Sequence, residues 1–113
     1  MDKAAHFDLD GLAMLEEVME EEFPELVRVF LQDSSPRCEA LRSAFAAQDS
    51  EQVREIAHSF KGASANLSAV QLAELCFVVE TAGRENNLAA LNDKIDAIEA
   101  EFAQVKAIFQ TMI

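Results

Sequence analysis

Apolar side chains recur along the last quarter of the chain at spacings that alternate between three and four residues. The run comprises Leu88, Leu91, Ile95, Ile98, Phe102, Val105, Phe109 and Met112. This spacing predicts one long helix over residues 88–112 with a continuous apolar face. A dimeric coiled coil is the alternative explanation of such a stripe. It is disfavoured because other amphipathic segments of the same chain also need an apolar surface to pack against.

Four further helices are predicted, over residues 8–19, 24–47, 50–67 and 69–86. Pro24 suits the first turn of its helix, where the missing N–H is harmless. The apolar register of that helix continues across Pro36, so we expect one helix kinked there. Two helices broken at residues 34–36 are the less favoured alternative.

Helix boundaries are predicted from polar residues at capping positions. Asp49 with Gln52, and Ser68 with Gln71, have the spacing of capping boxes, and Asn86–Asn87 can cap the last helix. Only three glycines and two prolines interrupt the chain, which disfavours an all-β fold. The prediction is a single all-α domain over residues 1–113. Its architecture is an antiparallel up-down four-helix bundle with a short additional N-terminal helix.

Composition excludes several classes of function. The formal net charge of −12 argues against nucleic acid as a partner, because phosphate backbones are bound by concentrated Lys and Arg. No apolar run approaches the length of a membrane span, and no basic-then-apolar leader opens the chain. Cys38 and Cys76 form no C-x-x-C pair, which is typical of a reduced compartment. We therefore expect a cytoplasmic monomer.

Two histidines are present, and they differ in what they indicate. His6 falls in an N-terminus expected to be frayed and is uninformative. His58 lies in the middle of a predicted helix and points away from its apolar stripe. Arg54 lies one turn before it and Lys61 one turn after, in a chain with only nine basic residues. Position alone does not assign a function, because surface histidines are common and these cations could pair with neighbouring glutamates.

The segment around His58 is more specific. His58-Ser59-Phe60-Lys61-Gly62-Ala63-Ser64-Ala65-Asn66-Leu67 resembles the signature of histidine-containing phosphotransfer (HPt) domains. Two departures are mild: Phe60 replaces the commoner leucine, and Ser68 stands where a glycine often follows. The resemblance implies a phosphorelay intermediate that carries a phosphoryl group on His58 between aspartates of receiver domains. Those receivers would belong to sensor kinases and response regulators. It also implies a carrier without its own ATP site and without a cofactor, any Mg²⁺ being held by the partner receiver.

The chemistry of these side chains agrees with that function. A neutral imidazole has one ring nitrogen free to attack while the other donates a hydrogen bond. We expect Nε2 to be the nucleophile. Phosphoryl transfer needs positioning and positive charge near the equatorial oxygens, which Lys61 can supply. Small residues at Gly62 and Ala65, together with Arg54, predict a surface that a partner can approach.

The following helix adds three candidates. In a hairpin that reverses near residue 68, His58 lies level with residues 78–80. Glu80 could then orient the ring and Arg84 could approach the phosphate, and the resemblance supports a polar orienting residue on this helix. Alternatively, Glu80 and Arg84 form only an i,i+4 ion pair. Phe77 either joins a docking patch or is covered by the first helix.

Other functions are less well supported. A histidine autokinase would need a phosphate-binding glycine loop, and the three glycines are isolated. An acyl carrier needs a leucine after its serine, which Asp33-Ser34-Ser35 lacks. A metal site at His58 would have too few ligands. A non-catalytic helical adaptor remains the alternative.

Overall fold

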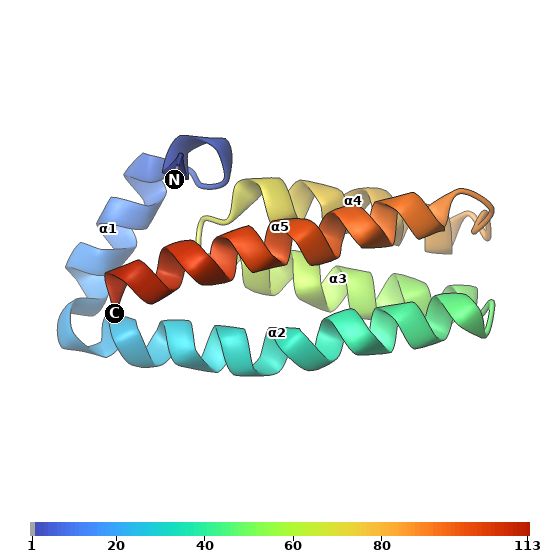
Figure 1. The fold of residues 1–113 in the computed structure, drawn as a ribbon, viewed down its shortest axis with the longest axis horizontal. Helices are drawn as coiled ribbons and strands as arrows, with labels where there is room; N and C mark the ends of the chain where they lie inside the picture. Colours follow the sequence, from blue (N-terminus) through green and yellow to red (C-terminus); the bar gives the residue numbers. More distant parts are fainter. Residues whose placement is uncertain (1) are drawn as a thin grey trace.

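The chain folds as a bundle of long helices (Figure 1). The computed structural model describes residues 2–113 and contains five α-helices, and these residues form no β-strand. The helices are α1 (Leu9–Met19), α2 (Phe23–Ala46), α3 (Ser50–Asn66), α4 (Val70–Arg84) and α5 (Leu91–Met112), with short 3₁₀ turns at Lys3–Ala5 and Glu20–Glu22. Helices α2 to α5 run side by side along the long axis, and α1 lies across the end where α2 begins and α5 ends. The predicted bundle with its extra N-terminal helix is thus confirmed.

The core consists of the predicted apolar stripes, brought together on the bundle axis. Val27, Val53, Val79, Ile95 and Ile98 are fully buried. At the end of the bundle near α1, the ring of Phe109 makes edge-to-face contacts with Phe7, Phe23 and Phe30. Such contacts add to the hydrophobic gain of burying each ring. Each helix therefore packs one face into the core, and its opposite face is left on the surface, where it can contact other molecules.

Helix α2 is continuous from Phe23 to Ala46, with Pro24 in its first turn and Pro36 in its interior. The prediction of a single helix through Pro36 is confirmed. Proline removes one backbone hydrogen bond. The apolar contacts of Val27, Phe30 and Leu41, all buried on α2, hold the helix together on both sides of the proline.

Helices α3 and α4 approach each other closely, because Gly83 has no side chain. A Cβ atom at Gly83 would lie 2.8 Å from the backbone nitrogen of Arg54 and 3.0 Å from the carbonyl oxygen of Ser50. Contacts this short exclude any larger residue unless the helices move apart. The glycine therefore lets α4 lie against the first turn of α3.

The predicted helix caps were only partly right. Asp49 caps α3, accepting a hydrogen bond of 3.2 Å from the backbone of Gln52. The prediction for Ser68 is wrong: α4 begins at Val70, and Ser68 adopts a left-handed conformation (φ 61°) that ends α3. The prediction for Asn86 is also wrong, since Asn86 (φ 53°) ends α4 and α5 begins only at Leu91. Both residues tolerate the left-handed region that reverses a chain after a helix.

The expectation of a frayed N-terminus is contradicted. His6 Nδ1 lies 2.7 Å from Glu101 Oε2 on α5, and Phe7 is buried in the core. The backbone N–H of Asp8 donates to the carbonyl of Ser68. These contacts fasten residues 6–8 to α5 and to the α3–α4 turn.

Candidate functional site: a histidine beside a buried carboxylate

His58 lies on the outward face of α3, as its position in the sequence predicted. Its side chain is 65% exposed, whereas Val53 and Phe60 on the same helix are fully buried. The Cα atom of His58 is held in place by the packed helix α3, while the imidazole ring extends into solvent. A nucleophile in this place can meet a group carried by another molecule.

Glu80 on α4 is the residue that fixes the ring. It is only 2% exposed, and its Oε2 lies 2.9 Å from Nδ1 of His58. The prediction that His58 lies level with residues 78–80 of the next helix is therefore confirmed. A buried charge is costly unless partners surround it, and Glu80 has three partners.

Lys61 and Arg84 are the other two partners of this carboxylate. Lys61 Nζ lies 2.7 Å from Oε1, and Arg84 Nη2 lies 3.0 Å from Oε2. The i,i+4 pair of Glu80 and Arg84 thus exists, but as part of a larger cluster that includes the histidine. Both cations lie within one turn of His58 or of the residue that holds it.

The pKa of Glu80 reflects two opposing causes. Burial disfavours the charged form and alone would raise the pKa, but the hydrogen bonds from Lys61 and His58 outweigh it, so the net pKa is lowered. The group is therefore an ionised carboxylate at neutral pH. A carboxylate only accepts hydrogen bonds, so Nδ1 of His58 must carry a proton. In the neutral ring, Nε2 is then left with a free lone pair.

The remaining predicted residues occupy different surroundings. Phe77 is 41% exposed, and Lys61 Nζ lies 5.2 Å from its ring centroid in a cation–π contact. Phe77 is thus on the surface beside the site. Arg54 pairs with Glu51 and Glu55 on its own helix, so it does not join the Glu80 cluster.

Two hollows flank His58 on either side of α3. The one between α3 and α4 has a volume of about 390 Å³ and is lined by Lys61, Gly62, Ala65, Val70, Ala73, Glu74 and Phe77. A Cβ at Gly62 would meet nothing within 4 Å, so this glycine does not serve helix packing. The surface beyond His58 is open and carries mostly small or apolar side chains.

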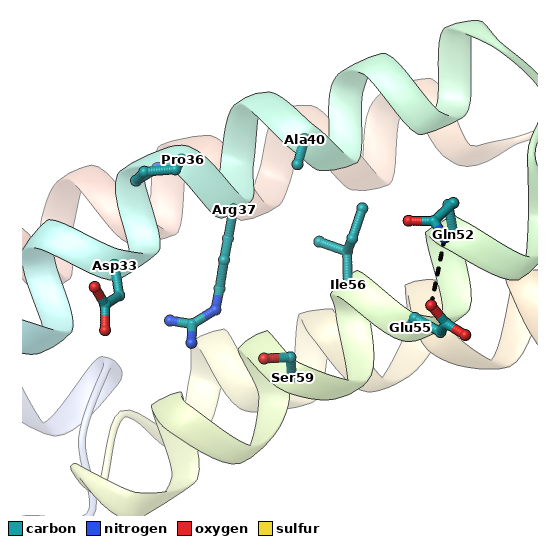
Figure 2. A pocket seen from close by; sticks show the side chains of 8 residues that line it. All are labelled: Asp33, Pro36, Arg37, Ala40, Gln52, Glu55, Ile56 and Ser59. Atoms are coloured by element: carbon teal, nitrogen blue, oxygen red, sulfur yellow. Dashed lines mark hydrogen bonds between the residues drawn. The ribbon is translucent and has the colours of Figure 1, made fainter.

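The second hollow, between α2 and α3, includes residues that the sequence did not indicate. Its volume is about 320 Å³, and it is lined by Asp33, Pro36, Arg37, Ala40, Gln52, Glu55, Ile56 and Ser59. Figure 2 shows Arg37 extending from α2 across the gap toward α3, near Ser59. Ser59 follows His58 directly in the sequence. Arg37 is far away along the chain, and only the packing of α2 on α3 shows that it flanks the site.

Neither a metal-binding cluster nor a membrane-spanning helix is found among the described residues. Among residues 2–113, no group of three or more His, Cys, Asp or Glu side chains is placed to hold a metal ion. The described helices include none that is long and apolar enough to cross a membrane.

The chain matches a known domain family and resembles several solved structures. The family model for the Hpt domain matches residues 25–108. Histidine-containing phosphotransfer protein B from Pseudomonas aeruginosa is a similar solved structure, with 41% identity and a TM-score of 0.92, covering 95% of this chain and 93% of its own. The maize histidine-containing phosphotransfer protein ZmHP2 shares 22% identity with a TM-score of 0.88, over 99% of this chain and 86% of its own, and shows the same fold. No curated protein sequence matches the chain.

Proposed function

Because the chain belongs to the Hpt domain family and therefore has a histidine phosphotransfer role in phosphorelays, we propose that Nε2 of His58 is the atom that carries the phosphoryl group. One observation carries this proposal: Glu80 holds the proton on Nδ1 at 2.9 Å while the rest of the ring is exposed. The nucleophilic nitrogen is thus both free and accessible. His6, the other histidine, is half-buried against α5.

Lys61 and Arg84 are proposed to offset the charge of the phosphoryl group. Both are within ion-pair distance of Glu80 and lie on flexible side chains that can reach outward. The transfer of a phosphoryl group is helped by positive charge beside its equatorial oxygens. We assign no covalent role to either residue.

Receiver domains are the partners of proteins in this family, and we propose that they dock over the two hollows beside α3. The small side chains of Gly62 and Ala65 and the exposed ring of Phe77 would admit the rim of a receiver's phosphorylation site. Arg54 lies at the edge of this surface. Any Mg²⁺ would come with the receiver, and the protein would act as a monomer that draws its phosphoryl group from partners and not from ATP. Its free cysteines, Cys38 and Cys76, suit a cytoplasmic setting.

A panel of phosphorylated receiver domains provides the test. The protein is incubated with each labelled receiver, and the appearance of label on the protein is followed over seconds to minutes. Acid-labile, alkali-stable label on His58, located by mass spectrometry, supports the proposal. Label on another residue would refute the assignment, and no label from any receiver or from a small phosphoramidate would favour a non-catalytic adaptor.

A further inference from the structure

Both oxygens of the Glu80 carboxylate face nitrogen-bearing side chains. Oε1 faces Lys61 at 2.7 Å, while Oε2 faces His58 Nδ1 at 2.9 Å and Arg84 at 3.0 Å. A glutamine in this place could accept at only one of the two positions. Its NH₂ group would have to face either Lys61 or the imidazole. The site is therefore built for a negative charge and not merely for a polar group of this shape.

The transfer reaction can be written without moving a proton. The Nε2 lone pair attacks phosphorus, the bond from phosphorus to the receiver's aspartyl oxygen breaks, and the aspartate leaves with that electron pair. The ring now bears phosphorus on Nε2 and hydrogen on Nδ1, so it is an imidazolium. In the reverse step an aspartate oxygen attacks phosphorus, and the Nε2–P electron pair returns to a neutral ring that still holds its Nδ1 proton.

Loss of the Nδ1 proton would change the leaving group. A phosphorylated ring without that proton would have to leave as an imidazolate anion, which is a far poorer leaving group than neutral imidazole. A nearby carboxylate opposes this loss, because it stabilises the cationic ring through a charge-assisted hydrogen bond. A pair that is partly buried, as this one is, is also less screened by salt than a fully exposed pair.

We propose that Glu80 keeps the Nδ1 proton on the ring while His58 is phosphorylated, so that the phosphoryl group stays ready to leave up to a higher pH than in a site without a carboxylate. This inference rests on the proposed function of His58. It makes Glu80 a positioning residue that also sets the lability of the phosphohistidine.

The charged and titratable groups around Glu80 all allow this role. Lys61 contacts it from α3, and Arg84 contacts it from α4. These cations favour its ionised form. Cys76, one turn earlier on α4, has its pKa raised by burial to about 12, so it stays neutral and does not compete for the charge.

The test compares the wild-type chain of residues 1–113 with its Glu80→Gln variant after both have been phosphorylated by a small phosphoramidate. Loss of the phosphoryl group to water is followed by ³¹P NMR from about pH 6 to about pH 10. The rate should begin to fall at a higher pH in the wild type than in the variant. At about pH 9 the variant should lose the group roughly tenfold more slowly, the factor expected when a charge-assisted hydrogen bond is replaced by a neutral one. Coincident pH profiles would overturn the inference.

Two controls keep the result interpretable. Glu101→Gln removes the carboxylate partner of His6 and should leave the profile unchanged; an equal shift in this control would mean that general charge, and not Glu80, is responsible. Since Glu80→Gln could fail to fold, the ¹⁵N NMR spectrum of the phosphorylated wild type provides a second measurement. A protonated Nδ1 at about pH 9 supports the inference, and a deprotonated one refutes it. Failure of the wild type to become phosphorylated would instead contradict the proposed function.

Discussion

Each of the two histidines of this chain is paired with a glutamate, but the two rings differ in their exposure and in the charged residues around them. In each, Nδ1 faces a glutamate carboxylate from a distant part of the chain: Glu80 at 2.9 Å for His58, and Glu101 at 2.7 Å for His6. The ring of His58 is 65% exposed, whereas that of His6 is 17% exposed. Lys61 and Arg84 join the first pair, but no Lys or Arg within residues 2–113 forms an ion pair with Glu101.

This contrast shows which features make a histidine reactive here. A histidine–carboxylate pair fixes the tautomer in both places, so the pair alone does not define the site. Access to Nε2 and nearby positive charge distinguish His58. At His6 the same pair ties the N-terminal segment to α5, which is a structural function.

The largest difference between the pairs should appear when each ring is removed. His58→Gln should abolish phosphorylation, because no other group can take the phosphoryl, while His6→Gln should be labelled as well as the wild type. Label uptake from a phosphoramidate or a receiver domain measures this directly. The melting temperature of His58→Gln should fall only slightly, because Lys61 and Arg84 still pair with the buried Glu80 when the ring is gone. Phosphorylation of the His58→Gln variant would show that His58 is not the only phosphoacceptor and would contradict the contrast with His6.

Blocking access to His58 should have the next largest effect. Gly62→Gln should slow transfer from receiver domains at least about tenfold, because a bulky residue one turn from the ring keeps a docked partner from reaching it. Labelling by a small phosphoramidate should change much less. Equal losses with both donors would mean that residue 62 acts on the ring itself.

Gly83→Ala is the matched control for that change. Gly62 faces open space, whereas a Cβ at Gly83 would lie 2.8 Å from the backbone of Arg54. Gly62→Gln should therefore be as stable as the wild type or slightly more stable, given the gain of about 1 kcal/mol in helix propensity. Gly83→Ala should be destabilised. A lower melting temperature for Gly62→Gln would show that this glycine is needed for packing.

Removing the cation beside His58 should have a smaller effect. Lys61→Ala should reduce the transfer rate by about tenfold without abolishing it, because it removes a positioned charge and leaves the nucleophile. Rapid-quench measurement of transfer gives the rate. Lys61→Arg keeps the charge and should recover much of the loss; a wild-type rate in Lys61→Ala would remove Lys61 from the site.

The smallest effect on transfer is expected at the second histidine, where the consequence is for stability. His6→Ala leaves the buried Glu101 without its partner. It should lower the free energy of unfolding by about 1.5–3 kcal/mol, the range for a hydrogen bond to a charged group. Urea denaturation measures this change, while transfer rates should stay the same. Unchanged stability would indicate that Phe7 and the backbone hydrogen bond of Asp8 are enough to hold residues 6–8.

The sequence was sufficient to predict the helices and the exposed position of His58, because both depend on local patterns. Apolar spacing determined which face of α3 is buried and hence that His58 is exposed. The level of Glu80 followed from the assumption of a tight α3–α4 hairpin. Arg37 could not have been found in this way, since its place depends on how α2 packs against α3. Ser68 and Asn86 were misassigned because residues that cap helix starts also adopt the left-handed conformation that ends them. Nor does any local signal show that His6 reaches Glu101, which follows 95 residues later.

The four interacting residues of the site, His58, Lys61, Glu80 and Arg84, lie on two helices joined by the short turn at residues 67–69. The geometry of the site is therefore determined by the α3–α4 hairpin and by the close contact at Gly83, and the other helices support this hairpin. Changes of length in the segment between α4 and α5, residues 85–90, would leave the spacing of ring and carboxylate intact, whereas a single added residue at 67–69 would rotate one helix and separate them. Evolution or design could thus reshape much of the bundle's exterior while the reaction chemistry is inherited unchanged.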